Sequence, residues 1–123
     1  MIVLSNGNIQ VNRGDDFTFD LSSFLKENKD FRSFYKEVTF EVGDKVVFYF
    51  LRPNENYECA TLRKEITVSE NNILHIVFSF SHEDTNDYPS GTCFYEIKLI
   101  HTDDDSTKSS YRTIVPRRKV VLL

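Results

Sequence analysis

The chain has 123 residues, a formal net charge of −4 at pH 7, and a hydrophobic fraction of 40%. That fraction is too high for a disordered chain, and a chain of this length can bury one core, so we expect a single soluble globular domain over residues 1–123. The negative charge argues against nucleic-acid binding through the phosphate backbone. The longest apolar run, Val46–Leu51, is far below the roughly 20 residues that cross a bilayer, and residues 1–4 lack the features of a secretion signal, so we expect neither a membrane span nor export.

Alternation of apolar and polar residues with a period of two dominates the sequence and predicts an all-β protein. Ile9 and Val11 indicate a first short strand, residues 12–16 indicate a turn, and residues 17–21 resume the alternation. The stretch 22–36 is less regular, and we interpret it as a loop that contains one helical turn.

The middle of the chain predicts a hairpin. Residues 38–42 alternate, Gly43-Asp44 supplies a two-residue turn that begins with glycine, and residues 45–52 form the second arm. This arm is apolar on both faces, which is typical of a central strand buried between layers.

Three more strands follow. Residues 57–68 alternate weakly, with Leu62, Ile66 and Val68 inward, and in residues 73–80 the even-numbered positions from Leu74 to Phe80 face one way. Residues 81–90 indicate a polar loop. Residues 92–101 and 111–123 then indicate the last two strands, joined by an acidic tip. About seven short antiparallel strands at spacings near ten residues predict a β-sandwich.

The two cysteines, Cys59 and Cys93, are too few for a disulfide-dependent scaffold. We expect two reduced and mostly buried thiols. The alternative is a single bridge between two strands that face each other across the sandwich.

Several short motifs occur in a characteristic order. They are Arg13-Gly14-Asp15-Asp16 followed by Phe-x-Phe, a strand that ends in Leu51-Arg52-Pro53, the loop Glu83-Asp84-Thr85, the strand Gly91-Thr92-Cys93-Phe94-Tyr95-Glu96-Ile97, and Arg112-Thr113-Ile114-Val115. This order, from about Ile9 to Val121, resembles the immunoglobulin-like domains of tailed-phage and prophage structural proteins, in particular the N-terminal domain of baseplate upper proteins. Cys93 stands where the first aromatic residue of the family's strand is usual.

The resemblance implies an immunoglobulin-like sandwich with a structural role in a virion tail or baseplate, assembled in the bacterial cytoplasm, and without catalysis. The partners would be copies of the same chain in a homo-oligomer, or other tail proteins. Phe24, Phe31, Phe34 and Tyr35 concentrate in the least regular segment, so we predict that they form an apolar contact surface. The alternative is that this segment plugs one open end of the sandwich.

The sequence ends on an apolar run. Val121, Leu122 and Leu123 therefore predict an edge strand that pairs with another chain. Either a neighbouring subunit covers this strand, or the sequence is the first domain of something longer.

Other functions have weaker support. The surplus of aromatic residues also fits a carbohydrate-binding module that attaches a virion or surface complex to a bacterial wall, although tryptophan is absent. We expect no catalytic residue and no cofactor, because no nucleophile elbow or phosphate-binding loop is present. The acidic residues at 83–87 and 103–105 indicate solvated loops rather than a calcium site. His75, His82 and His101 lack zinc-ligand spacing with the cysteines, so we expect no metal site, and we place His75 and His101 at outward or edge positions of strands.

Overall fold

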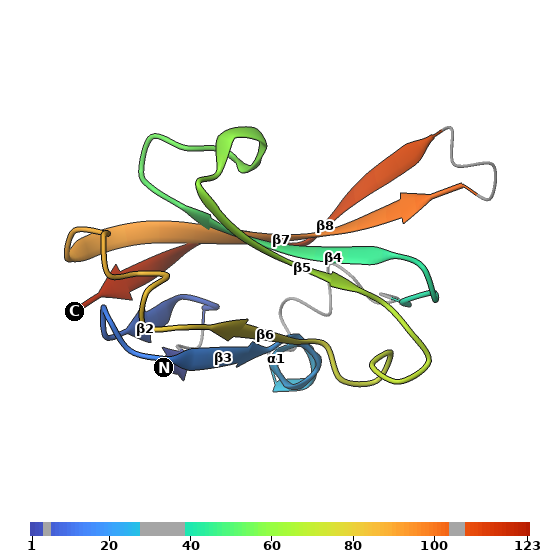
Figure 1. The fold of residues 1–123 in the computed structure, drawn as a ribbon, viewed down its shortest axis with the longest axis horizontal. Coiled ribbons are helices and arrows are strands. Elements are labelled where there is room, and N and C mark those ends of the chain that lie inside the picture. Colours follow the sequence, from blue (N-terminus) through green and yellow to red (C-terminus); the bar gives the residue numbers. More distant parts are fainter. Residues whose placement is uncertain (4–5, 28–38, 104–107) are drawn as a thin grey trace.

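The computed structural model of the protein describes residues 1–3, 6–27, 39–103 and 108–123. They form two β-sheets that face each other, with one short helix beside the smaller sheet (Figure 1). The strands are β1 (Ile2–Val3), β2 (Ile9–Val11), β3 (Phe17–Asp20), β4 (Lys45–Leu51), β5 (Leu62–Thr67), β6 (Val77–Phe80), β7 (Gly91–Thr102) and β8 (Ser109–Leu122). The prediction of a mostly β protein is confirmed.

The larger sheet has six strands in the order β1-β2-β8-β7-β4-β5, and the smaller sheet consists of β3 and β6. All neighbours run antiparallel except β2 and β8, which pair in parallel with Ile9 opposite Val120. The expectation of about seven antiparallel strands is therefore wrong for this pair, and the described residues contain eight strands.

Aromatic rings fill the space between the two sheets. Phe48 on β4 stacks on Tyr95 of β7 with ring centroids 5.2 Å apart. From the smaller sheet, Phe19 and Phe80 approach the same Phe48 ring, at 5.4 and 4.9 Å. Edge-to-face and offset contacts of this kind add to the stabilisation that burial alone provides. The core therefore holds the two sheets at a fixed separation.

Strand β4 is buried on both faces, as its composition predicts. Val46, Phe48 and Phe50 belong to the core between the sheets, whereas the alternate residues form a second apolar cluster on the outer face of the larger sheet. The loop over residues 52–61, which includes a 3-10 helix, η1 (Tyr57–Cys59), lies over this outer cluster (Figure 1).

Two predicted strands differ from the expectation. Residues 39–42 do not form a strand, and Val42 is 60% exposed. The reason is the turn at Gly43, where φ is +98° and the amide donates to the carbonyl of Val68, so the chain enters the sheet only at Lys45. Strand β6 begins at Val77, and Leu74, which was expected to share a strand face with Ile76, is instead 78% exposed in the preceding turn.

The stretch after β3 forms α1 (Leu21–Glu27), which is longer than the single turn expected. Asp20 caps its start, because one carboxylate oxygen accepts a hydrogen bond from the Ser23 amide at 3.0 Å. Two hydrogen bonds to the backbone of Ile76 fix the helix beside β6. The Leu21 amide donates to the Ile76 carbonyl, and Ser22 Oγ accepts a bond from the Ile76 amide. Among the described residues, no helix combines the length and hydrophobicity needed to span a membrane.

Candidate functional site

The pairing of β4 with β7 places an acidic side chain opposite a histidine. Lys45 lies opposite Ile100 in this antiparallel ladder, so one step further along brings Asp44 opposite His101. The turn that precedes β4 then fixes Asp44. Its Oδ2 accepts a hydrogen bond from the Glu41 amide at 3.0 Å, and its own amide donates to the Glu41 carbonyl, also at 3.0 Å.

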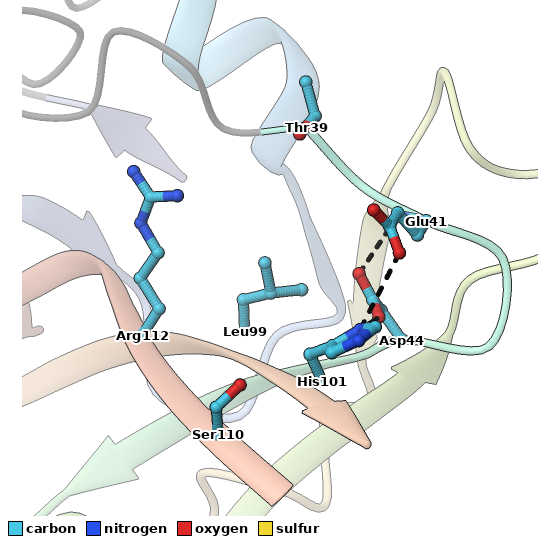
Figure 2. Close-up of a pocket in the computed structure, with 7 residues that line it drawn as sticks. All are labelled: Thr39, Glu41, Asp44, Leu99, His101, Ser110 and Arg112. Carbon is cyan, nitrogen blue, oxygen red and sulfur yellow. Dashed lines mark hydrogen bonds and ion pairs between the residues drawn. The ribbon is translucent and has the colours of Figure 1, made fainter. Parts of the chain in front are cut away.

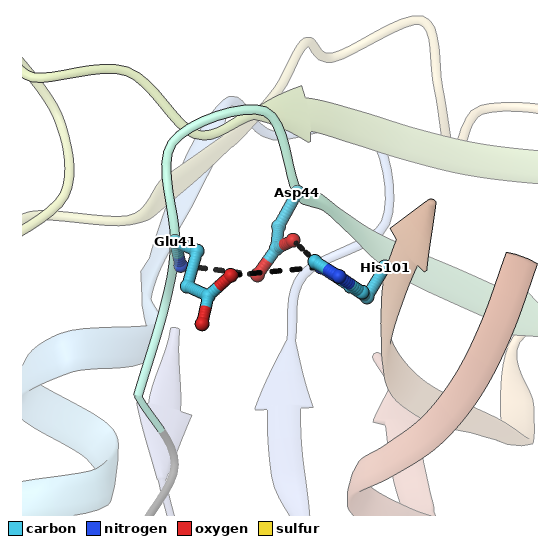
Figure 3. Close-up of side chains that lie close together, drawn as sticks. All are labelled: Glu41, Asp44 and His101. Carbon is cyan, nitrogen blue, oxygen red and sulfur yellow. Dashed lines mark hydrogen bonds and ion pairs between the residues drawn. The ribbon is translucent and has the colours of Figure 1, made fainter. Parts of the chain in front are cut away.

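Glu41, Asp44 and His101 form a compact cluster, which Figure 3 shows. Nδ1 of His101 lies 2.6 Å from Oδ1 of Asp44 and 3.9 Å from Oε2 of Glu41. Asp44 is only 3% exposed, whereas the Glu41 side chain is largely exposed. The hydrogen bond to Asp44 raises the pKa of His101 above its ordinary value; partial burial opposes this shift, and the negative charges of Asp44, Glu41 and Asp103 reinforce it.

The cluster forms one wall of a cavity of about 220 Å³, which lies between the turn before β4, the end of β7 and the start of β8. Arg112 of β8 lies on the other side of the cavity, and Leu99 forms its floor (Figure 2). The complete lining is Thr39, Glu41, Asp44, Leu99, His101, Ser110 and Arg112. One imidazole nitrogen and two carboxylates are donors that a divalent metal ion accepts, and the guanidinium opposite adds a site for an anion.

Sequence reasoning missed this cluster. It treated Gly43-Asp44 only as a turn and placed His101 at an outward or edge position, whereas His101 is half-buried against Asp44. The sequence did contain one indication of the cluster, namely the predicted central strand over residues 45–52. If that strand pairs antiparallel with residues 92–101, its first residues lie close to His101.

A second surface lies on the outer face of the larger sheet, and we call Tyr57, Lys98 and Tyr111 the outer tyrosine face. The rings of Tyr57 and Tyr111 are 6.4 Å apart, and Nζ of Lys98 lies 4.3 Å from the centre of the Tyr57 ring. Below them, Tyr49 packs edge-on against Tyr57 at 5.6 Å. Tyr111 is 57% exposed, so this face presents an aromatic ring to solvent on a rigid support.

Arg117 extends the same face toward the loop over residues 52–61. Its guanidinium lies 4.3 Å above the centre of the Phe94 ring and donates hydrogen bonds to the carbonyls of Glu55 and Pro53, at 2.8 and 3.2 Å. These contacts hold the loop against β8.

The structure does not support the predicted role of Phe24. It is only 4% exposed and packs against Phe19 in the core, with ring centroids 5.1 Å apart. The prediction was wrong because α1 turns this side chain into the core between the two sheets. Phe31, Phe34 and Tyr35 lie outside the described residues.

The C-terminal strand is not an open edge. Within the described chain, β8 lies between β2 and β7, so the prediction of an edge strand at Val121, Leu122 and Leu123 is wrong. The parallel pairing with β2 occupies the backbone groups that an edge would leave free, and the Leu123 amide donates to the carbonyl of Val11 at 3.0 Å. Leu122 is buried, Val121 is half-buried, and the side chain of Leu123 alone of the three is exposed.

Both cysteines are free thiols, as expected, but their environments differ. Cys93 is buried, and burial raises the pKa of its thiol. Cys59 is exposed, which contradicts the expectation that both are buried. Of the acidic loops, Asp84 is paired with Lys64 at 3.0 Å, and residues 104–107 lie outside the described residues.

No family model, curated protein or solved structure matches the chain. Function is therefore inferred from the two surfaces described above, the cavity beside His101 and the outer tyrosine face.

Proposed function

We propose that this protein is a structural module of a phage or prophage tail or baseplate, located in the virion, which acts by protein–protein assembly on an immunoglobulin-like sandwich. The observation that carries the proposal is the outer tyrosine face, where Tyr57 and Tyr111 stand beside Lys98 on the larger sheet. Tyrosine and arginine are enriched in the buried central part of protein–protein interfaces. Arg117 adjoins this face.

Lys98, at the centre of this face, is held in place before any partner binds. Lys98 Nζ donates a hydrogen bond to Thr113 Oγ1 at 2.8 Å and forms an ion pair with Glu96 at 3.2 Å, and its position above Tyr57 follows from these two contacts. Side chains that are already ordered lose little conformational entropy on association, so more of the contact energy appears as affinity.

The position of the family-like motifs also supports this proposal. The motif over residues 91–97 forms the first half of β7, and the motif over residues 112–115 pairs with β7 in β8, with Ile97 opposite Val115. Two sheets packed face to face around an aromatic core are consistent with the sandwich that the resemblance implies.

The test is the molar mass of the purified chain, measured by size-exclusion chromatography with light scattering over a wide dilution series. We expect a closed homo-oligomer that dissociates on dilution, and we expect Tyr111→Ala to raise the dissociation constant at least about tenfold, the usual effect of losing an interface anchor. Leu74→Ala is the matched control, because Leu74 is also exposed and apolar but lies in the turn before β6. A wild-type monomer at every concentration, or equal weakening by both substitutions, would contradict self-assembly through this face.

The same face favours a second candidate function, a carbohydrate-binding module that attaches a virion or surface complex to a bacterial wall. Two neighbouring tyrosine rings, tilted by 42°, provide adjacent aromatic surfaces on which sugar rings stack. Calorimetric titration of the monomer with bacterial cell-wall saccharides distinguishes the two candidates. Saccharide binding that is lost in Tyr111→Ala, together with a monomeric wild type, would favour this second function.

A further inference from the structure

We propose that Glu41, Asp44 and His101 form a binding site for one divalent metal ion of the zinc class. The two carboxylates face the same ring nitrogen of the histidine: Nδ1 lies 2.6 Å from Asp44 and 3.9 Å from Glu41. One ligand atom from each residue can be chosen so that all three lie within 4.8 Å of one another. An ion placed between these three side chains (Figure 3) would contact all of them once the donors move closer together.

The spacing of the donors is close to what zinc requires. Zinc binds imidazole nitrogen and carboxylate oxygen at about 2.0–2.2 Å, so tetrahedral ligand atoms stand about 3.4 Å apart. Oδ1 of Asp44 lies nearer than this to the histidine nitrogen and Oε2 of Glu41 lies farther, so small movements of Glu41 and His101 equalise the two distances. Both of these side chains are free to make them, because they are 70% and 43% exposed.

Asp44 is the fixed member of the set. The Glu41 amide donates to its Oδ2, which sets the orientation of the carboxylate and leaves Oδ1 directed at His101. A carboxylate that is almost fully buried is costly unless a positive charge neutralises it, and a bound cation supplies that charge. The backbone donor acts here as the outer partner that commonly orients a metal ligand.

The cavity provides the remaining coordination positions. Three protein ligands leave at least one position open on a zinc ion, and the cluster borders about 220 Å³ of space (Figure 2). Water or an oxygen atom of a small anion completes the shell from this side, with Arg112 across the cavity. When the ion binds, it replaces the proton that Nδ1 shares with Asp44, and that proton leaves to solvent.

A second histidine of the chain lacks this arrangement and serves as the matched control. His82 also contacts two carboxylates, but Asp16 lies 3.1 Å from its Nδ1, whereas Glu83 lies 3.9 Å from its Nε2. The two nitrogens are on different edges of the ring, so one ion cannot bind both carboxylates and this histidine together. The group of Asp16, His82 and Glu83 therefore has the same residue types as the proposed site, but its geometry does not allow one ion to bind all three.

The experiment is calorimetric titration of the tag-free, metal-stripped chain with zinc chloride, followed by thermal melts with and without one equivalent of zinc. We expect one saturable zinc ion for each chain and a rise in melting temperature. Glu41→Gln and His101→Gln should each weaken binding at least tenfold. His82→Gln and Cys59→Ser, which removes the exposed thiol as an alternative ligand, should bind zinc like the wild type.

Each outcome bears on the proposal. Because Glu41 is exposed, Glu41→Gln is expected to fold, and it tests the site even if His101→Gln does not give a cooperative melt. Absence of saturable zinc binding, or full affinity in Glu41→Gln, would overturn the site. Loss of binding in His82→Gln or Cys59→Ser would also overturn it, because the ion would then lie elsewhere.

Discussion

The hydroxyl of Tyr95, in the middle of β7, donates a hydrogen bond to the carbonyl oxygen of Gly7, in the turn before β2. Both residues are buried, so water cannot replace either partner. This bond links the segment between β1 and β2 to a central strand of the larger sheet, and it anchors the β1–β2 edge of that sheet to the core.

The first prediction follows from this bond. Tyr95→Phe keeps the ring against Phe48 but leaves the buried carbonyl of Gly7 without its donor, so we expect a loss of about 1–3 kcal/mol in the free energy of unfolding. Urea denaturation measures this loss. Tyr111→Phe removes a hydroxyl from an exposed ring and should change stability by less than about 0.5 kcal/mol. Equal effects of the two substitutions would show that the contact with Gly7 contributes nothing.

The second prediction concerns Phe24. Because this ring is buried against Phe19, Phe24→Ala should lower the free energy of unfolding by about 3–5 kcal/mol through lost burial and a cavity. Leu74→Ala, at an exposed position, provides the comparison and should have little effect. Weakened association in Phe24→Ala with an unchanged urea midpoint would contradict burial and would indicate that Phe24 contacts a partner.

The third prediction is a pH dependence at Asp16. The backbone amide of His82 donates to its carboxylate, and the His82 ring makes a second hydrogen bond, so the pKa of Asp16 is lowered. A lowered pKa in the folded state means that this carboxylate contributes stability above its unfolded pKa, near 3.9, and loses the contribution as the pH falls through the folded value. Melting temperatures between pH 6 and pH 2.5 should therefore fall less steeply in Asp16→Asn than in the wild type.

Asp87→Asn is the control for that measurement, because it removes an exposed carboxylate elsewhere. If the melting temperatures of the wild type and of Asp16→Asn fell equally steeply with falling pH, the pair of Asp16 with His82 would not stabilise the fold.

The fourth prediction concerns the thiols. In the native protein, a disulfide reagent should modify Cys59 rapidly and Cys93 only on the timescale of unfolding, because Cys93 is buried and burial raises the pKa of its thiol. Absorbance should therefore report one fast equivalent, and a second only after denaturant is added. The fast equivalent should disappear in Cys59→Ser. Two fast equivalents in the wild type would show that Cys93 is accessible in the folded chain.

Local patterning was enough to predict some elements. The residues of β7 from Cys93 to Leu99 alternate cleanly, and Cys93, Tyr95, Ile97 and Leu99 face the core as predicted. The run in β4 is apolar on both faces because the loop over residues 52–61 covers the side that does not face the smaller sheet. Both signals depend on short-range periodicity, which the sequence displays directly.

Other features depend on contacts between distant segments. Val42 is apolar and fits an alternating pattern, yet it lies in a turn that the bond from the Gly43 amide to the Val68 carbonyl holds in place. Leu74 also fits such a pattern, but it lies in a turn closed by its own short-range backbone bonds, such as that from the His75 amide to the Asn72 carbonyl. The cluster of Glu41, Asp44 and His101 exists only because of the register between β4 and β7. A one-residue slip in that register would turn the opposing side chains to the other face, so composition alone could not have identified the cluster.

The parallel pairing of β2 with β8 has a consequence for folding. Ile9 and Val120 come from nearly opposite ends of the sequence, so the chain must close a very long loop before this contact stabilises anything. We therefore expect β2 and β1 to join the sheet late. Until they do, the strand that carries Val120 and Leu122 offers a hydrophobic, unpaired edge to neighbouring chains. The protein is therefore most prone to aggregation in the interval before β2 pairs with β8. A high local concentration of newly made chains would increase the fraction that aggregates during this interval.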